Sequence, residues 1–221
     1  MLPGVRPPAP MLRGVRLPVI TGTNQIATSG VGAINMPMPA GVQEGDLLAI
    51  FVIQSAGSAR NMSIPTGWQQ LYNEVGPLSA RRCGGFWKFA GASEPATHTV
   101  STGSSGSWTG ISCKIEDAAG IEAATHQGTD AIAPCPALAP SWADDGSLWL
   151  SVCHKVNDTG EDTPPDGFDV AVTRSGGGGN INRMTLAQRA MLSDEMRPGP
   201  FELLSSNPMW VTATLAVRPV S

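Results

Sequence analysis

The chain is poor in charged residues and has no long apolar segment. Asp, Glu, Lys and Arg make up 14% of its 221 residues, against roughly 25% in a typical soluble domain. This deficit indicates either a surface covered by partners or a neutral surface rich in Ser and Thr. The longest apolar run, residues 47–53 (LLAIFVI), is too short to cross a bilayer as a helix. We therefore expect no membrane insertion.

The sequence also lacks the patterns that mark metal sites and common enzymes. Its 4 cysteines form no Cys-x-x-Cys pair and are spaced too widely for a metal knuckle, so we interpret them as mostly buried thiols. There is no Gly-x-Ser-x-Gly elbow, no Gly-x-x-x-x-Gly-Lys loop and no His-Glu-x-x-His pair. We expect a protein without catalytic residues or cofactors.

Charge is unevenly distributed along the chain. All 18 acidic residues follow residue 43, whereas Arg6, Arg13 and Arg16 precede it. A body this acidic is a poor partner for nucleic acid, so we expect no direct contact with it. A cationic segment ahead of an acidic body is instead suited to docking on a neighbouring copy.

Residues 1–20 are predicted to form an extended arm. Five prolines in this segment exclude a helix and discourage a central strand. The same prolines, together with the three arginines, interrupt any apolar region of the kind found in a signal peptide. The arm lies either on its own body or on another subunit, and we favour another subunit, with Arg6, Arg13 and Arg16 as its partner-binding residues.

The rest of the chain has the pattern of an all-β protein. Its 26 glycines and 19 prolines, together about a fifth of the residues, cluster between short apolar runs. Residues 108–115 and 210–217 alternate between apolar and other side chains, which predicts half-buried strands. The continuous apolar run at 47–53 predicts a buried strand. Residues 183–196 are the best helix candidate, but we favour a strand for their first part.

Three motifs recur about 100 residues apart. Gly45-Asp46-Leu47-Leu48 corresponds to Gly146-Ser147-Leu148-Trp149, Pro65-x-Gly67-Trp68 to Pro165-x-Gly167-Phe168, and Trp108 to Trp210. The two copies are either separate domains or halves of one sandwich. Because an apolar sheet face needs a second sheet to cover it, we favour the sandwich. We therefore predict a single jelly-roll-like β-sandwich over residues 21–221, with pseudo-repeated halves at about 36–125 and 146–218.

Two features invite a binding role. The loop 158–169 is acidic, and Asp158, Asp162 and Asp166 are a candidate calcium site, although their spacing matches no EF-hand. A solvated acidic loop is the alternative. Most of the 6 tryptophans are interpreted as core residues, whereas Trp142 lies outside the repeat and is expected to face a ligand or solvent.

The motifs of the first half follow one another in a familiar order. Gly45-Asp46-Leu47-Leu48, Pro65-x-Gly67-Trp68 and Trp87-Lys88-x-Ala90-x-x-x-Glu94-Pro95 precede a Ser/Thr-rich strand and a Trp-bearing strand. This pattern resembles one that is common in virion proteins of tailed bacteriophages. The resemblance covers roughly residues 36–117, with 146–218 as a degenerate second copy in which Phe168 replaces Trp. It implies a β-sandwich serving as a capsid decoration, head fibre or tail appendage, without known catalytic residues.

Our leading hypothesis is a non-enzymatic virion protein, made in the host cytoplasm, that attaches to capsid or tail subunits through its arm and forms a homo-oligomer. The alternative is an adhesion module that binds a host surface glycan through exposed aromatics and the loops 101–107 and 175–180. A hydrolase would need paired carboxylates, and only the loop 158–169 offers them.

Overall fold

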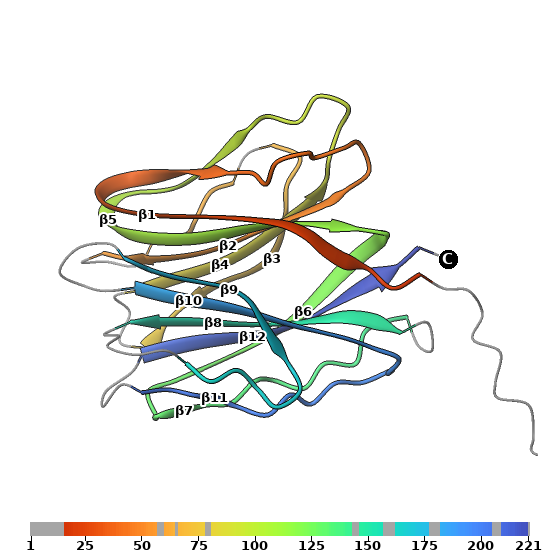
Figure 1. Ribbon diagram of the computed structural model, residues 1–221. Helices are drawn as coiled ribbons and strands as arrows, with labels where there is room; N and C mark the ends of the chain where they lie inside the picture. The colour runs from red at the N-terminus through yellow and green to blue at the C-terminus, as the bar shows by residue number, and fades with distance from the viewer. Residues whose placement is uncertain are drawn as a thin grey trace, which may run out of the picture.

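The computed structural model describes residues 16–56, 60–64, 66–77, 81–142, 146–156, 162–176, 182–204 and 209–220. Two five-stranded antiparallel sheets stack face to face, as Figure 1 shows. The first contains β1 (Val19–Pro37), β2 (Leu47–Ser55), β3 (Gln69–Val75), β4 (Arg81–Phe89) and β5 (Thr97–Glu116). The second contains β6 (Ala118–Gly128), β8 (Ser147–Val156), β9 (Asp169–Gly176), β10 (Asn182–Met191) and β12 (Met209–Pro219). The prediction of an all-β sandwich is confirmed.

The two sheets share one strand order. The first runs β1-β5-β2-β4-β3 and the second β6-β12-β8-β10-β9, so that each strand of one half occupies the position of its counterpart in the other. The chain completes the first sheet before Ala118 begins the second, and the jelly-roll connectivity is therefore not confirmed. The strand favoured for the first part of residues 183–196 is confirmed, since residues 182–191 form β10.

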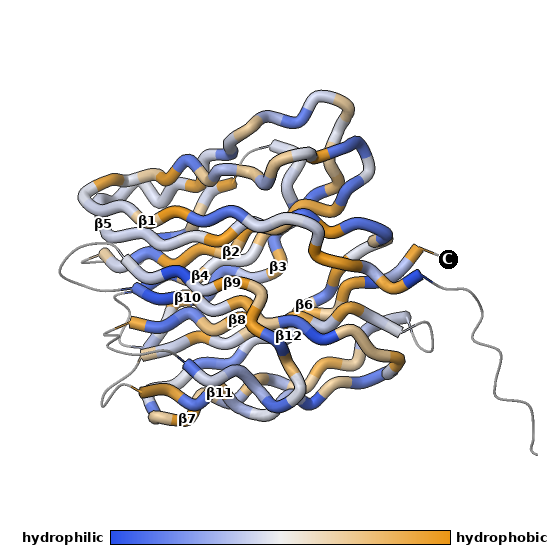
Figure 2. The backbone as a smooth tube through the Cα atoms, viewed as in Figure 1, coloured by the Kyte–Doolittle hydropathy of each residue, from blue (hydrophilic) through white to orange (hydrophobic). Residues whose placement is uncertain are grey.

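The main core lies between the sheets, where the predicted alternation is realised. Ile111, Cys113 and Ile115 of β5 belong to this interior cluster, to which the second sheet contributes Val211 and Leu215 of β12. β2 is buried along its whole length because both of its faces are covered. Figure 2 shows apolar and polar residues interspersed along the strands, as this alternation requires.

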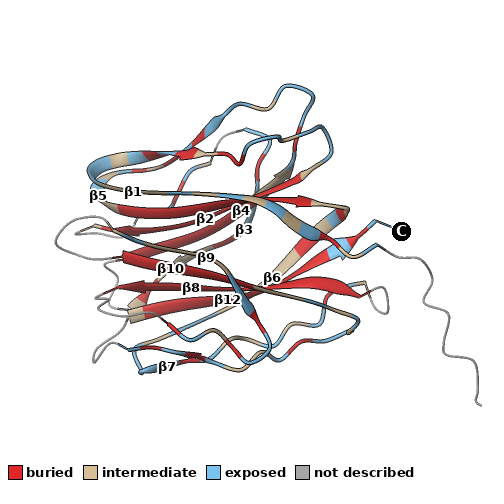
Figure 3. Ribbon diagram, in the orientation of Figure 1, coloured by how far each residue is buried: buried red, intermediate tan, exposed pale blue. Residues whose placement is uncertain are grey.

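Both sheets also have a covered outer face, which makes four layers in all. In the first sheet, residues 31–37 of β1 and 97–106 of β5 pair with each other and fold back over the sheet, and Trp108 donates its indole N–H to the Val31 carbonyl at 2.9 Å. In the second, segments carrying β7 (Ile132–Ala133) and β11 (Phe201–Glu202) do the same, and Trp210 donates to the Asp130 carbonyl at 2.9 Å. Figure 3 shows the buried central strands between these layers.

The repeated Pro-x-Gly-aromatic motif forms the corner before β3 and again before β9. Gly67 and Gly167 have φ angles of 90° and 76°, which side chains other than glycine rarely adopt. Trp68 and Phe168 follow directly and are buried in the two outer cores. Pro65 lies outside the described residues, whereas Pro165 accepts a hydrogen bond from the Phe168 N–H at 3.0 Å. The described residues therefore have the packing role expected of a structural corner.

Candidate functional site

A hollow of the surface lies on the open side of the sandwich, between β1 and the β9–β10 edge. The two edges meet at one end, where a Cβ on Gly176 would lie 2.7 Å from the Cβ of Ala27. Toward Val19 and Asp169 they diverge and enclose two adjoining hollows of about 330 Å³ and 270 Å³, both lined by Gln188. We call this wedge the β1–β10 groove.

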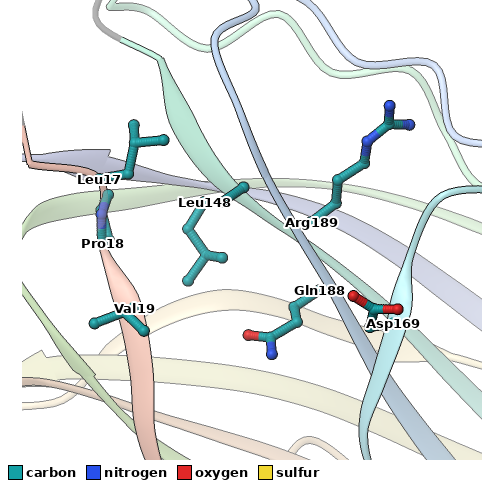
Figure 4. Close-up of a pocket in the computed structure, with 8 residues that line it drawn as sticks. Leu17, Pro18, Val19, Leu148, Asp169, Gln188 and Arg189 are labelled. Atoms are coloured by element: carbon teal, nitrogen blue, oxygen red, sulfur yellow. The ribbon is translucent and has the colours of Figure 1, made fainter.

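The larger hollow has one apolar wall and one polar wall. Leu17, Val19 and Leu148 form the apolar wall, and Asp169 and Gln188 lie opposite, as Figure 4 shows. Asp169 opens β9 and is paired in register with Gln188 of β10, so the two polar side chains approach each other. This arrangement suits an extended ligand that carries an apolar group beside a cationic or hydrogen-bonding group.

Arg189 also borders the larger hollow but is directed away from it. Its side chain extends away from Gln188 in Figure 4, as expected for neighbouring residues of a strand. The guanidinium packs over Gly167, where a Cβ would lie 2.7 Å from the Arg189 Nη1. Asp169 is therefore the charged group best placed to meet a ligand in the groove.

The N-terminal segment enters the sandwich at the mouth of this groove. Arg16 Nη1 lies 3.3 Å from the Asp117 carboxylate, in the corner between β5 and β6. Leu17 packs beside Gly146, where a Cβ would lie 3.0 Å from its Cδ2, and Pro18 is buried. The Asp117 carbonyl also accepts a hydrogen bond from the Val220 N–H at 3.1 Å. One corner therefore fixes both described ends of the chain.

Of the three arginines expected to bind a partner, only Arg16 is described, and it contacts its own chain. Arg6 and Arg13 lie outside the described residues. The expected arm boundary at residue 20 is close to the observed one, since β1 begins at Val19. The exposed Arg16–Asp117 pair contributes little energy by itself, so the buried Pro18 and the packing of Leu17 are the firmer attachments.

Trp142, expected to face a ligand, is half-buried and engaged within the chain. Its indole N–H donates to Ser147 Oγ at 3.1 Å, and the Arg218 guanidinium lies 5.9 Å from its ring centroid. Both the polar edge and one face of the ring therefore already have partners. This geometry does not favour Trp142 as a sugar-stacking platform.

The three aspartates of the calcium candidate do not act together in the structure. Asp158 lies outside the described residues, and Asp166 is exposed. Asp162 has a fully buried side chain that pairs with the equally buried Lys155 ammonium. Within the described ranges there is no group of three or more His, Cys, Asp and Glu side chains able to hold a metal ion.

The motif residues Trp68, Lys88 and Glu94 form a connected polar network with His98 on the outer face of the first sheet. Trp68 Nε1 donates to His98 Nδ1 at 3.3 Å, and His98 Nε2 lies 2.6 Å from Glu94 Oε1. Glu94 also accepts bonds from Lys88 at 2.9 and 3.0 Å and from the Gly91 N–H at 3.0 Å. The sequence interpretation missed His98, which it treated as isolated.

The electrostatics of this network favour an ionised Glu94. Burial raises its pKa, but the hydrogen bonds from Lys88, Gly91 and His98 outweigh that effect and leave the pKa below its ordinary value. The carboxylate therefore serves as the acceptor that joins three donors. No nucleophile is hydrogen-bonded to His98 among the residues described, and the network holds the fold together.

The cysteines are free thiols, as expected. Cys83, Cys113 and Cys153 are buried, and Cys135 is half-buried. Burial raises the pKa of Cys113 to about 12 and that of Cys135 to about 11, so both are protonated at neutral pH. These thiols are thus not activated nucleophiles.

The part of the chain that the structure describes contains no helix long and apolar enough to span a membrane. No family model, curated protein or solved structure matches the chain.

Proposed function

We propose that this chain is a non-enzymatic structural protein of a phage or phage-like virion that attaches to a larger particle through its N-terminal arm. The observation that carries the proposal is the anchoring of the arm at Arg16, Leu17 and Pro18, on the corner that also holds the C-terminal strand. This anchor lies on the open side of the sandwich, next to a groove with an apolar wall.

The motif resemblance supports the same proposal. The shared residues Trp68, Lys88 and Glu94 stabilise the outer face of a sheet through His98 instead of forming a reactive site. These residues stabilise the fold, and structural proteins of one kind are expected to share the residues that stabilise their common fold. The low proportion of charged residues suits a protein whose surface is partly covered by neighbours.

We further infer that the two halves are a pseudo-repeat. Gly45 and Gly146 precede β2 and β8 with φ angles of 91° and 75°, and the corner glycines Gly67 and Gly167 agree in the same way. Together with the shared strand order, these pairs support duplication of one sheet-forming unit. The groove then lies where an edge of each copy meets the other.

Particles released by the source cells test the proposal directly. They are banded in a density gradient, and the band is analysed by mass spectrometry for this chain. We expect the chain at a fixed ratio to the main capsid or tail protein, and loss of incorporation when residues 2–15 are deleted. A chain found only in the unbanded soluble fraction contradicts the proposed function, and full incorporation of the deletion variant contradicts the role of the arm.

A further inference from the structure

The N-terminal segment contains one short sequence twice. Residues 1–8 read Met-Leu-Pro-Gly-Val-Arg-Pro-Pro, and residues 11–18 read Met-Leu-Arg-Gly-Val-Arg-Leu-Pro. The two copies differ only at their third and seventh positions. Each therefore offers a Val-Arg pair followed two positions later by proline.

The structure shows what the end of the second copy does. Arg16 pairs with Asp117, Leu17 packs beside Gly146 and Leu192, and Pro18 is buried. The Arg-x-Pro end of the repeat thus docks by placing its arginine on a carboxylate and its next two residues on apolar surface. The first copy carries the same elements in Arg6, Pro7 and Pro8, and it needs a site of the same chemistry.

The β1–β10 groove offers that chemistry beside the docked second copy. Its hollow of about 330 Å³ has the apolar side chains of Val19 and Leu148 on one side and the Asp169 carboxylate on the other. Val19 is 47% exposed, which leaves apolar surface to be covered. Among the described residues Asp169 has no ion-pair partner, whereas Asp117 is already occupied by Arg16.

We propose that residues 1–8 of one copy bind in the β1–β10 groove of a second copy, with Arg6 on Asp169 and with Val5 and Pro7 against Val19 and Leu148. The proposal rests on the role of the arm in the proposed function and names the neighbour that the arm contacts. A reciprocal exchange of arms closes a symmetric dimer, and an exchange in one direction links copies into a ring or row.

Reach and stiffness favour a second copy over the same chain. Ten residues separate Arg6 from Arg16, which corresponds to about 33 Å when extended. Pro7, Pro8 and Pro10 have fixed φ angles and favour an extended course. The groove begins at Leu17 itself, so binding in the same chain would require a sharp reversal between residues 8 and 15, whereas a neighbour can be reached without one.

Charge reversal in the full-length chain tests the contact. We expect the wild-type chain to self-associate in sedimentation velocity experiments, and Arg6→Asp or Asp169→Arg to weaken the association at least about tenfold. The double variant Arg6→Asp/Asp169→Arg restores the pair in the opposite orientation and should recover most of the affinity. Arg60→Asp, at an exposed arginine, changes the net charge by the same amount as Arg6→Asp and should leave association unchanged.

Three results would overturn the inference. A monomeric wild-type chain excludes the second copy as occupant, and cross-links from residues 1–8 to the groove within such a monomer assign the groove to the chain's own arm. A double variant no better than the single ones excludes the Arg6–Asp169 contact, as does an equal loss with Arg60→Asp.

A chain that self-associates but never bands with particles retains this inference while the proposed function fails. A chain that bands with particles but does not self-associate retains the proposed function and overturns this inference.

Discussion

Tyr72 and His154 are hydrogen-bonded across the interior of the sandwich, with the Tyr72 hydroxyl 2.8 Å from His154 Nε2. Tyr72 belongs to β3 of the first sheet and His154 to β8 of the second, and both side chains are buried. Burial alone lowers the pKa of His154 to about 3, so the imidazole is neutral in the folded protein at ordinary pH. A polar bond between sheets therefore depends on an uncharged histidine.

This relationship predicts that the protein loses stability in mild acid. The unfolded chain binds a proton at His154 near pH 6.5, whereas the folded chain does not until about pH 3. The stability that the folded protein gains by keeping His154 neutral is therefore fully present above pH 6.5, and it is lost as the pH falls from there toward 3. We expect protonation of His154 in the unfolded chain to make the free energy of unfolding about 2 kcal/mol smaller at pH 5 than at pH 7.5. Urea denaturation at the two pH values measures this difference.

The slope of the free energy of unfolding against pH, and not its value at one pH, identifies His154 as the cause of the acid sensitivity. His154→Gln removes the titration and should flatten the dependence on pH between about pH 5 and 7.5, whatever its effect at neutral pH. The exposed His126 serves as the control, because His126→Gln should retain the wild-type slope. Equal slopes for wild type and His154→Gln would show that the buried imidazole does not couple to acid unfolding.

The corner tryptophan provides a second prediction. Trp68 is buried and donates its indole N–H to His98, so Trp68→Ala should lower the free energy of unfolding by about 3–5 kcal/mol. Trp68→Phe keeps the ring, as Phe168 does in the second half, and should cost only about 1–2 kcal/mol. Urea denaturation followed by circular dichroism measures both. If Trp68→Ala left stability intact but abolished binding to particles, the corner would be a recognition site.

The third prediction concerns Glu94, which joins the donors of the outer network. Glu94→Gln removes the charge opposite Lys88 and one acceptor position, and should lower the free energy of unfolding by about 2 kcal/mol. Glu44→Gln makes the same chemical change at an exposed carboxylate and should have almost no effect. Equal small effects in the two variants would mean that the network adds nothing to stability.

Local sequence patterns predicted the strands well, for physical reasons. The alternation of Ile111 and Cys113 with Trp108 and Ser112 is imposed by the pleat, so it specifies a strand wherever the chain lies. The same holds for Gly67, whose positive φ depends on its own backbone. Such features need no knowledge of distant contacts, and their recurrence about 100 residues later agrees with the strand order that the two sheets share.

Features that depend on contacts between distant residues could not be predicted in this way. No pattern in the sequence set residues 31–37 apart, yet they fold over the sheet because Ile34 and Met36 pack near Trp108. Likewise no pattern linked His98 to Glu94, and Asp162 was interpreted as a calcium ligand or a solvated acid, because the partners of both residues are set by strand register and layer packing. The groove itself was not anticipated, because Asp169 and Gln188 meet Val19 only through the stacking of two sheets.

Lys155 and Asp162 form another buried polar contact, beneath the outer layer of the second sheet. Both side chains are fully buried, and Lys155 shares its outward face of β8 with Trp149 and Cys153. Charges removed from water in this way are stable only as a pair, since the cost of burying either one alone is several kcal/mol. We therefore expect a large coupling energy between Lys155 and Asp162 but little net gain in the free energy of unfolding.

A double-mutant cycle measures that coupling. Lys155→Met removes the cation that faces the buried Asp162 carboxylate, and Asp162→Leu removes the anion that faces the Lys155 ammonium, so each should lower the free energy of unfolding by about 3–5 kcal/mol. The double variant replaces both charges with apolar groups and should be no less stable than either single variant, which gives a coupling energy of at least about 3 kcal/mol by urea denaturation. Additive losses would instead indicate that the two charges are independently solvated, and Asp162 would again be available to a cation.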